Sequence, residues 1–427
     1  MRVLHWFRND LRLTDNPALL AATREATELI GLYVFDERWF EEGIHNGPRI
    51  SGYRAQFIWE CLEDLKVGLA SIGGQLIILK GNTVGLIASS FTEYECDFLS
   101  FTKHVGHEEI GDEKAIVSLL GSDKVMSRWG HTLVDIDNLP FTIEKLPNIF
   151  TPFRGKIEKY HTYPTTVESV QKQFSPISGM DSPGLSSFSE LRIQPSSIDE
   201  RAVLQFKGGE KAANERLRHY TWDSQALSTY KETRNGLVGA DYSSKFSPWL
   251  ATGSISPRTI LEEVKKYEDE VGANDSTYWL IFELLWRDFF QLVALKHSHE
   301  LFAEFGWKGY ARDWKHNFGL FKKWIDGTTG DPFVDANMKE LKRTGFMSNR
   351  GRQNVASFLV HQYKIDWRWG ASYFEEMLID YDVASNWGNW SYVSGTGNDP
   401  RKDRVFNTKL QAERYDPDGE YQRIWLD

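Results

Sequence analysis

The chain has only two cysteines among its 427 residues, and other features that mark particular classes of protein are also missing. Cys61 and Cys96 cannot build a disulfide framework, and strand-like apolar sequence begins at Val3, which leaves no room for a signal peptide. No apolar run reaches the roughly 18 residues that a membrane-spanning helix needs. With 41% hydrophobic and 26% charged residues, the composition is that of a globular protein. We therefore expect a cytoplasmic protein with no membrane partner.

The motifs of several common sites are absent as well. There is neither a GxGxxG nor a GxxxxGK[ST] phosphate motif, and no GxSxG nucleophile elbow. The 11 histidines are scattered, and no cluster of His, Cys and Asp has the spacing of a zinc or di-iron site. The sequence thus predicts no metal and none of the usual dinucleotide or serine-hydrolase sites.

The net charge of -10 argues against indiscriminate binding of nucleic acid. A total charge can nevertheless hide a local basic surface. Five basic residues fall within one short segment: Lys339, Lys342, Arg343, Arg350 and Arg352. A solvated helix face and a nucleic-acid-binding patch both account for such a segment, so both interpretations stay open.

The first third of the chain alternates short apolar runs with helix-like segments. The runs VLHWF, LIGLYVF, QLIILK and CDFLSF are separated by segments such as residues 18–28 and 53–71. This alternation predicts an α/β domain with a parallel, doubly wound sheet over residues 1–135. Because ligands lie beyond the carboxyl ends of parallel strands, the loop RNDLRLTDNP after the first strand is a candidate functional edge.

The rest of the chain has a different pattern. Residues 136–200 are rich in Pro, Ser and Gly clusters without a repeating apolar face, which predicts a long linker. Helical periodicity dominates residues 201–427, for example in SISPRTILEEVKKYEDE, where Ser254 or Ser256 is a candidate N-cap before Pro257. We therefore expect an all-α C-terminal domain.

Most of the 16 tryptophans belong to this helical half, and one helix places charges beside them. A tryptophan-rich core explains any single indole. In YWLIFELLWRDFF, however, Glu283, Trp286 and Arg287 recur at i, i+3 and i+4 and share one helix face. Either Glu283 and Arg287 form a surface pair, or the apolar neighbours bury them and they need other partners or a ligand.

Two further segments carry polar groups at regular spacing. SNRGRQNVASFLVHQY places Asn349, Arg352 and Gln353 on one helix face, and two such faces can enclose a polar aromatic ligand. In LIDYDVASNWGNW, Asp380 and Asp382 are two residues apart, so both carboxylates point the same way if the segment is extended.

Two stretches look like functional loops. Residues 385–392, SNWGNWSY, deliver amides and tryptophans together without a helical or strand period. Upstream, DYSSKFSPWLATG gathers Ser243, Ser244 and Ser247 around Lys245. Hydroxyls, backbone amides and one cation suit a phosphate, but a capped turn before a helix explains the same residues equally well.

Six motifs, in order and over nearly the whole chain, resemble the photolyase/cryptochrome family: WFRNDLRLTDNPAL, DYSSKFSPWLATGSISPR, ELLWRDFF, TGFMSNRGRQNVASFL, IDWRWG and DYDVASNWGNW. The likeness is strongest to the DASH-type cryptochromes. Members of that branch repair cyclobutane pyrimidine dimers, chiefly in single-stranded DNA, and bind FAD with, usually, 5,10-methenyltetrahydrofolate as antenna. The resemblance implies an α/β antenna domain, a long linker, and a helical domain that holds FAD folded into a U.

The resemblance also implies which residues contact FAD. Arg352 matches the partner of Asp380 beside the flavin, and Asp382 matches the acceptor for flavin N3–H. Asn386 matches the residue that faces flavin N5, where a neutral amide adds no negative charge beside the reduced ring. The full implied set is Tyr230, Ser243, Ser244, Lys245, Phe246, Ser247, Glu283, Arg287, Asn349, Arg352, Asp380, Asp382 and Asn386.

Three tryptophans and five lesion-facing residues follow from the same motifs. Trp390, Trp367 and Trp314 match a relay of indoles by which the photoexcited flavin is reduced, with Trp390 next to the flavin. The groups around a flipped dimer match Glu283, Trp286, Asn349, Gln353 and Tyr392. In the family, excited reduced FAD gives an electron to the dimer, a protonated glutamate steadies it, and an indole stacks on it.

Two positions distinguish this chain from duplex-repairing photolyases, which carry Met at the place of Gln353 and Trp at the place of Tyr392. Both differences are typical of the DASH branch and imply weak binding of lesions in duplex DNA. For the antenna, Glu108 matches a folate-contacting glutamate, although an acidic residue at a helix start needs no ligand.

Two alternative functions remain. A blue-light signalling receptor would use the same flavin and relay but pass the change to a protein partner, and its usual mark, a long C-terminal extension, does not follow YQRIWLD. A nucleotide-binding α/β enzyme whose helical domain only oligomerises would purify without colour.

Overall fold

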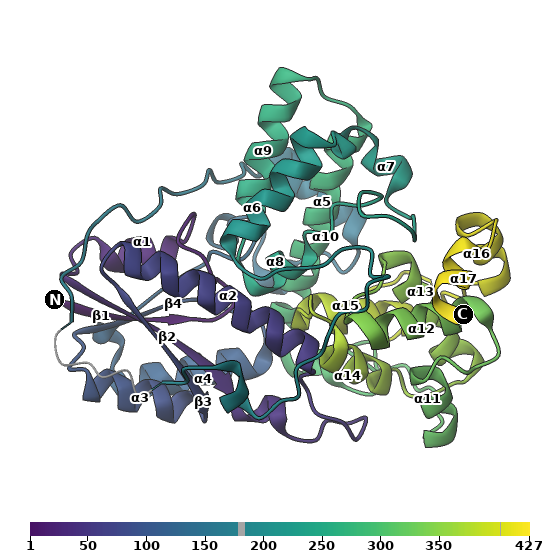
Figure 1. Ribbon diagram of the computed structural model, residues 1–427, viewed down its shortest axis with the longest axis horizontal. Helices are drawn as coiled ribbons and strands as arrows, with labels where there is room; N and C mark the ends of the chain where they lie inside the picture. Colours follow the sequence, from purple (N-terminus) through teal and green to yellow (C-terminus); the bar gives the residue numbers. More distant parts are fainter. Residues whose placement is uncertain (178–183, 402) are drawn as a thin grey trace.

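The computed structural model describes residues 1–177, 184–401 and 403–427, and within them one parallel sheet forms the N-terminal part (Figure 1). Its strand order is β3-β2-β1-β4-β5. The strands are β1 (Arg2–Phe7), β2 (Glu28–Asp36), β3 (Gln75–Gly81), β4 (Phe98–Thr102) and β5 (Val125–Arg128). This arrangement confirms the predicted α/β class.

Helices cover both faces of the sheet, and this explains why its strands are continuous apolar runs. Val3 pairs with Leu29, and both face one apolar core, whereas Leu4 pairs with Ile30 and both face another. Strands that are buried on two faces need continuous apolar sequence, as VLHWF and LIGLYVF have. The helices of this part are α1 (Pro17–Thr23), α2 (Gly52–Ser71), α3 (Thr83–Glu93) and α4 (His107–Leu120).

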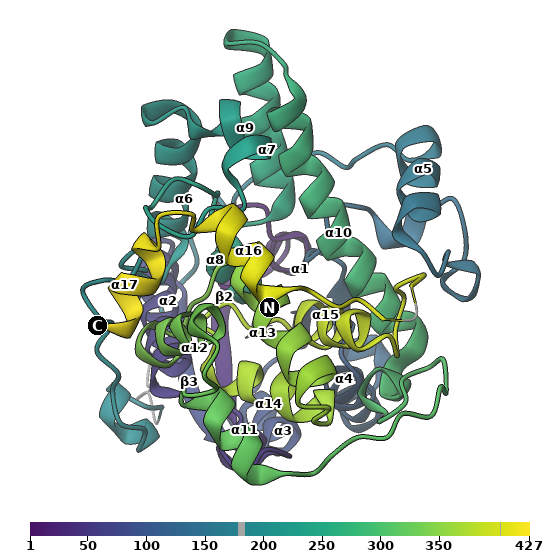
Figure 2. The same ribbon diagram turned by 90° about the vertical axis from the view of Figure 1, so that its right-hand side faces the viewer.

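The C-terminal part is helical, as predicted (Figures 1 and 2). Ser256, not Ser254, caps α9: its Oγ accepts from the Thr259 amide, and Pro257 is the first helical residue. The longer helices are α9 (Pro257–Glu270), α10 (Asp275–His297), α12 (Pro332–Thr344), α14 (Trp367–Met377) and α15 (Val383–Ser394). The shorter ones are α6 (Glu210–Arg218), α7 (Tyr230–Thr233), α8 (Ser247–Thr252), α11 (Phe318–Ile325), α13 (Asn349–Ser357), α16 (Thr408–Tyr415) and α17 (Glu420–Leu426). No helix in the described ranges is long and apolar enough to cross a membrane.

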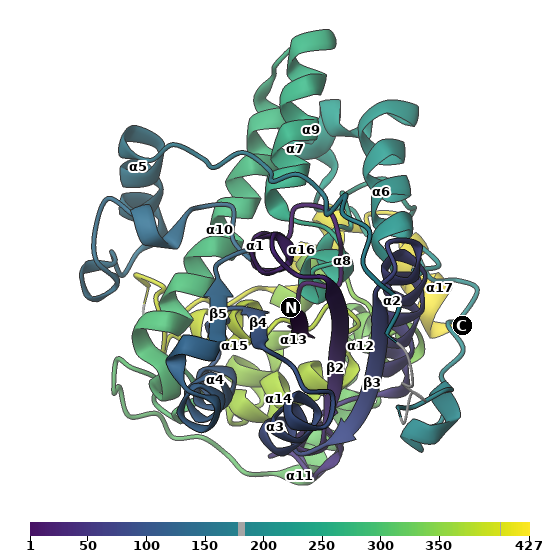
Figure 3. The same ribbon diagram turned by 90° about the vertical axis from the view of Figure 1, so that its left-hand side faces the viewer.

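The described part of the predicted linker contains an α-helix that the sequence pattern did not suggest, α5 (Phe150–Tyr160). Phe150, Phe153 and Ile157 are buried at helical spacing, and α5 lies beside α10 (Figure 3). The ring of Phe150 stacks on Trp286 of α10 with centroids 3.8 Å apart. Because turn-forming residues flank this short amphipathic face, the sequence pattern did not indicate a helix. Residues 178–183 of the predicted linker lie outside the described residues, and the domain limits stay a prediction.

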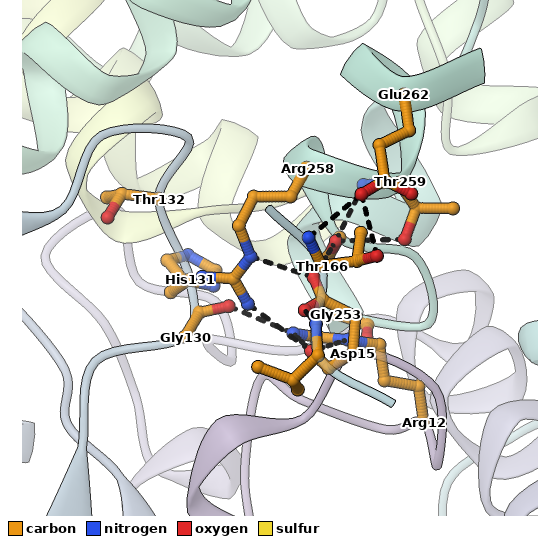
Figure 4. A network of polar contacts seen from close by, with 12 residues as sticks. Arg12, Asp15, Gly130, His131, Thr132, Thr166, Gly253, Arg258, Thr259 and Glu262 are labelled. Atoms are coloured by element: carbon orange, nitrogen blue, oxygen red, sulfur yellow. Dashed lines mark hydrogen bonds and ion pairs between the residues drawn. The ribbon is translucent and has the colours of Figure 1, made fainter. Parts of the chain in front are cut away.

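The loop after β1 joins the two parts of the molecule (Figure 4). The buried carboxylate of Asp15 accepts hydrogen bonds from Arg258 Nε at 2.9 Å, from Ser256 Oγ, and from the Val167 amide at 2.8 Å. It therefore ties the start of α9 and the connecting segment to the α/β part. Much of RNDLRLTDNP is a structural junction, although other residues of the same loop line a cavity described below.

Candidate functional site

The carboxylate of Asp380 lies at the centre of the helical part, just before α15. Arg352 of α13 donates to it, with Nη2 2.8 Å from Oδ2, and also donates through Nε to the carbonyl of Met347. The other carboxylate oxygen, Oδ1, is buried and has no partner among the described residues. The implied pair is therefore formed, and one lone acceptor is left for a donor from outside the protein.

Removing Arg352 should leave Asp380 as an unpaired buried charge. We expect Arg352→Ala to lower the free energy of unfolding by about 3 to 5 kcal/mol, the usual effect of breaking a buried ion pair. Arg343→Ala on α12 is the matched control, because that arginine is half exposed and should contribute less than about 1 kcal/mol. Denaturant unfolding of both variants measures the difference, and equal losses would show that removing Arg352 leaves no unpaired buried charge on Asp380.

Asp382 is the N-cap of α15 and has three partners from three elements. Its Oδ1 accepts from the Ser385 amide at 2.7 Å and from Gln291 Nε2 of α10 at 2.8 Å, while Oδ2 lies 3.5 Å from His131 Nε2. Burial alone would raise the pKa of Asp382, but the contact with His131 and the charge of Arg287 hold that pKa far below its ordinary value. Burial and Arg287 lower the pKa of His131 to about 4. The site thus presents a fixed carboxylate beside a neutral imidazole at pH 7.

The segment 385–392 is a helix, which corrects the prediction of a loop. Asp382 supplies the cap that starts α15, and Gly388 lets the helix pack closely on α10: a Cβ there would come 2.4 Å from Phe290. Asn386 donates to the Ala371 carbonyl of α14 at 2.9 Å, and Trp390 lies on the same helix face at i+4. Tertiary packing therefore overrides the weak helix propensity of Asn, Gly and Ser.

One cavity brings the flavin-facing and lesion-facing predictions together. It lies between α13, α14 and α15, which are neighbours in Figure 2. Its lining includes Asn349, Arg352, Gln353, Asp380, Asp382, Asn386 and Trp390. The buried Oδ1 of Asp380, which has no partner among the described residues, belongs to a side chain of this lining, so the cavity offers an acceptor to a ligand with N–H or O–H donors.

The serine-rich stretch ends where α8 begins, so a turn before a helix is present. The carbonyls of Ser243 and Ser244 accept from Arg216 at 3.1 and 3.0 Å, which fixes the turn. Lys245 has a left-handed φ of 55°, and its Nζ is buried without a hydrogen-bond partner, 3.3 Å from the ring centroid of Tyr242. Burial drives the pKa of Lys245 well below its ordinary value. An anion bound beside this buried amine would favour its protonated form.

The remaining residues of the implied phosphate loop lie at, or just before, the starts of α7 and α8. Phe246 is buried and precedes α8, and Ser247 is the first residue of that helix. Tyr230 begins α7 and is buried, with its ring 6.5 Å from that of Tyr220. Burial raises the pKa of Tyr230 well above its ordinary value, so its phenol stays neutral.

The three indoles of the predicted relay run from the cavity outward. Trp390 is buried against α14, where a Cβ on Gly370 would meet its ring at 2.2 Å, and Gly370 lies three residues after Trp367. The Nε1 atoms of Trp367 and Trp314 both donate to the carbonyl of Glu304, at 3.0 and 3.4 Å. Trp314 is partly exposed, so the series connects the interior with the surface.

The lesion-facing residues outside the cavity lining gather on α10 and the end of α15. The rings of Trp286 and Tyr392 meet edge to face, with centroids 6.0 Å apart. Glu283 lies one turn before Trp286, and burial raises its pKa although the charge of Arg234 opposes the shift. Of the two alternatives for this helix face, the surface pair of Glu283 with Arg287 is not formed: Arg287 donates to the carbonyl and ring of His131, at 2.6 and 2.7 Å.

Three arginines hold these groups, and the sequence assigned none of them to the site, although Arg350 belongs to the basic segment. Arg234 donates to Glu283 Oε1 at 2.6 Å, Arg350 donates to Gln353 Oε1 at 2.8 Å, and Arg404 donates to Tyr392 Oη at 2.8 Å. Only Arg350 is near its partner in sequence. Contacts across 49 and 12 residues leave no periodic signal that could have identified the other two.

The basic segment is divided between two environments. Lys342 and Arg343 lie at the exposed end of α12, where Asp326 and Asp199 partly neutralise them. Arg352 lines the cavity instead, and Arg350 donates to Gln353, which also lines it. Neither a single solvated face nor one basic patch describes the segment. Among the described residues, no group of His, Cys, Asp and Glu side chains is arranged to hold a metal ion.

A second cavity of about 390 Å³ lies between the sheet and the helical part. Glu108 at the start of α4 lines it and forms a two-point ion pair with Arg49, at 3.0 and 2.9 Å. Burial would lower the pKa of Arg49, but Glu375 and Glu108 hold it above its ordinary value. Asp382 and its neighbour Tyr381 line both cavities, so one short segment separates them.

Comparison with known proteins gives a consistent result. Residues 3–172 match the family model described as DNA photolyase, and residues 279–427 match the one described as the FAD binding domain of DNA photolyase. Curated proteins named Cryptochrome DASH from Gloeobacter violaceus and Synechocystis sp. are each 45% identical over 99% of this chain, which spans 85% and 87% of those relatives. A relative from Solanum lycopersicum, named Cryptochrome DASH, chloroplastic/mitochondrial, is 44% identical over 99% of this chain and 76% of its own length.

Solved structures show the same fold over the whole chain. The crystal structure of a Synechocystis cryptochrome superposes with a TM-score of 0.95 at 44% identity, and covers 100% of this chain and 88% of that one. A bacterial class III photolyase from Agrobacterium tumefaciens gives 0.86 at 29% identity, with 100% and 86% covered. The helical part is therefore an FAD-binding domain, and the chain belongs to the photolyase/cryptochrome family, among the proteins called cryptochrome DASH.

Proposed function

We propose that the protein is a blue-light-dependent photolyase that repairs cyclobutane pyrimidine dimers, mainly in single-stranded DNA. The observation that carries this proposal is that Asn349 and Gln353, expected to face a dimer, line the same cavity as Asp382 and Asn386, expected to face the flavin. An electron has only a short distance to travel between two ligands that share one cavity.

The residues present fit FAD. The free buried Oδ1 of Asp380 and the carboxylate of Asp382 would accept from the flavin and its ribityl hydroxyls, and the unpartnered Nζ of Lys245 would meet the pyrophosphate. Asn386 would offer its amide to flavin N5. When bound in the reduced form and excited by blue light, FAD supplies the electron that splits the dimer.

The protein's own contribution is to hold the dimer. Trp286 would give a stacking surface, because one face of its ring is already packed on Phe150 and the indole is held in place. Glu283, in its protonated form, would donate to the pyrimidine carbonyl on which charge develops. Asn349 and Gln353 would hydrogen-bond the same base edge, and Tyr392 would close the side opposite α10.

The preference for single strands rests on two substitutions. Flipping a dimer out of a duplex costs a few kcal/mol of unstacking and unpairing, whereas a single strand requires little. Gln353 and Tyr392 replace a thioether and a larger indole, so the apolar grip that would offset this cost is weaker. We infer efficient repair in single strands and poor repair in duplex.

We further propose that Trp390, Trp367 and Trp314 deliver electrons to the oxidised flavin. Indole is among the side chains that one-electron oxidants attack most readily, and these three lead from the cavity to a partly exposed ring. The shared Glu304 carbonyl would stabilise positive charge on either Trp367 or Trp314.

The interdomain cavity is the proposed site for 5,10-methenyltetrahydrofolate. Glu108 would accept from the pteridine amino group once its ion pair with Arg49 opens. Glu108→Gln should weaken folate retention about tenfold, the effect of losing one charge-assisted hydrogen bond, and leave FAD in place. The near-ultraviolet folate band relative to the flavin band measures this. Glu25→Gln, exposed on the same part of the molecule, is the control, and equal folate bands in both variants would remove Glu108 from the site.

Absorption spectra and a repair assay on the purified protein test the proposal together. We expect a yellow protein that is photoreduced in blue light with a reductant and then restores dimer-containing single strands in the light but not in the dark. A colourless protein that FAD cannot reconstitute would favour a nucleotide-binding enzyme. Photoreduction without any repair would favour a signalling receptor.

A further inference from the structure

Residues 41–49, which follow β2 and precede α2, form a loop at the edge of the interdomain cavity, and we call it the rim loop. The amide of Gly43 donates to the carbonyl of Gly47 at 2.6 Å and closes the turn of this loop. Gly43, Ile44 and Arg49 line the cavity. The rim loop is therefore one wall of the cavity, and it belongs to the α/β part of the chain.

The mouth of the cavity lies between the rim loop and the start of α4. Ile44 of the rim loop is 44% exposed, and the side chain of Glu108 on α4 is 42% exposed. Lining residues further in, such as Phe7 and Tyr33, are buried. Arg49 spans this mouth through its two-point ion pair with Glu108. A ligand that enters between the rim loop and α4 has to open this ion pair.

His45 fastens the tip of the rim loop to the helical part. Its Nε2 donates to Glu376 Oε2, and its Nδ1 shares a hydrogen bond with Ser372 Oγ, both at 2.7 Å. Ser372 and Glu376 are four residues apart on α14, so the two ring nitrogens contact one face of that helix. The imidazole is 6% exposed, and a carboxylate partner makes one of its two hydrogen bonds a strong one.

The imidazole of His45 holds the loop but does not face the ligand. The lining of the cavity includes its neighbour Ile44 and its partner Ser372, but not His45 itself. The ring packs edge to face against Tyr373 of α14, with centroids 6.0 Å apart. Replacing His45 should therefore change how easily the rim loop opens and leave the ligand contacts as they are.

The base of the rim loop is attached separately. Arg49 Nε donates to Glu375 Oε1 of α14 at 2.8 Å. The amide of Ser51, the N-cap of α2, donates to the carbonyl of Glu376 at 2.9 Å. Arg49 can keep Glu375 while its two Nη atoms leave Glu108, because different nitrogens make the two contacts. The tip of the loop can thus swing out while its base stays on α14.

We propose that the rim loop is the gate of the interdomain cavity and that His45 is the latch that keeps this gate closed. This inference rests on the proposed folate site and specifies how its ligand enters and leaves. Opening breaks both hydrogen bonds of His45 and the pair of Arg49 with Glu108. On closing, His45 returns to α14 while Glu108 turns to the ligand. His45 is a positioning residue, because it acts through the loop.

A latch and a ligand contact have different kinetic signatures. Entry and release pass through the same open state, so a latch that stabilises the closed state slows both by the same factor and leaves the dissociation constant unchanged. A group that contacts the ligand changes mainly the rate of release. His45→Ala should therefore speed entry and release together, whereas Glu108→Gln should speed release alone.

The test follows binding and release of 5,10-methenyltetrahydrofolate by the FAD-loaded protein in stopped flow, through the near-ultraviolet band of the folate. For His45→Ala we expect both rate constants to rise about tenfold, the effect of one charge-assisted hydrogen bond. In His45→Gln the amide can still donate to Glu376 and accept from Ser372, so slow exchange should be partly restored. Retention of the flavin band shows that each variant is folded.

His316→Ala is the matched control. His316 makes a similar contact at the other end of α14, with Nε2 3.6 Å from Asp366, and it is not part of the cavity lining. Its exchange rates should equal those of the wild type. Unchanged rates in His45→Ala, or faster release with unchanged entry, would overturn the latch. A wild type that binds no folate would instead refute the proposed antenna site.

Discussion

Trp390→Phe is expected to abolish light-driven reduction of the flavin while leaving the cofactor bound. Trp390 is buried on the cavity lining and packs against Phe374 and Trp324, with ring centroids 5.1 and 6.1 Å away. Phenylalanine keeps most of the volume of the indole, so the cavity should persist. It is far harder to oxidise, however, and the first step of the relay would be lost.

Flash photolysis or steady illumination with a reductant measures the rate of photoreduction. Trp367→Phe and Trp314→Phe should also reduce it, because they lie further along the same series. Trp425→Phe is the matched control: this indole is equally buried, but it packs in a separate core beside α12 and α17. Unchanged rates in Trp390→Phe would mean that electrons enter by another route.

Glu283→Ala is expected to lower the rate of repair by about 10- to 100-fold, the range for losing a hydrogen bond to a developing charge. The variant removes the only group on this face of α10 that is expected to donate to the pyrimidine carbonyl. Glu283→Gln is the informative control, since its amide can still donate without a titrating proton. It should retain most of the activity, and an equal loss in both variants would contradict the role of Glu283 as a donor.

The same residue predicts a pH dependence. Burial raises the pKa of Glu283, although the charge of Arg234 opposes the shift. The protonated fraction is complete below this raised pKa and falls as the pH rises through it, so repair by the wild type should decline toward higher pH. Glu283→Gln has no proton to lose there, and its profile should be flat over the same range.

The fold class could be predicted because both halves carry long, regular patterns. Apolar runs that alternate with helical segments gave the parallel sheet, and helical periodicity gave the C-terminal domain. Helices α5 and α15 were harder to predict from the sequence. The face of α5 is short and lies among turn residues, and α15 depends on the cap of Asp382 and on the close packing that Gly388 permits.

The residues of the site could be predicted only where they belong to a motif of the family. The resemblance supplied Asp380, Arg352 and Asp382, and the structure brings them to one cavity, although their roles toward FAD remain proposals. Pairwise spacing suggested Glu283 with Arg287, but tertiary contacts give each a different partner. A local i, i+4 pair is worth a few tenths of a kcal/mol, so it cannot outweigh a buried alternative.

The most direct test of the account is light-dependent repair of one defined cyclobutane pyrimidine dimer in a single-stranded oligonucleotide and in its matched duplex. Both substrates must be measured at one salt concentration, because contacts to phosphate make affinity depend on salt. The account predicts efficient repair of the single strand in blue light, little repair of the duplex, and none in the dark. Equal repair of both substrates would contradict the strand preference, and no repair of either would contradict the proposed photolyase activity.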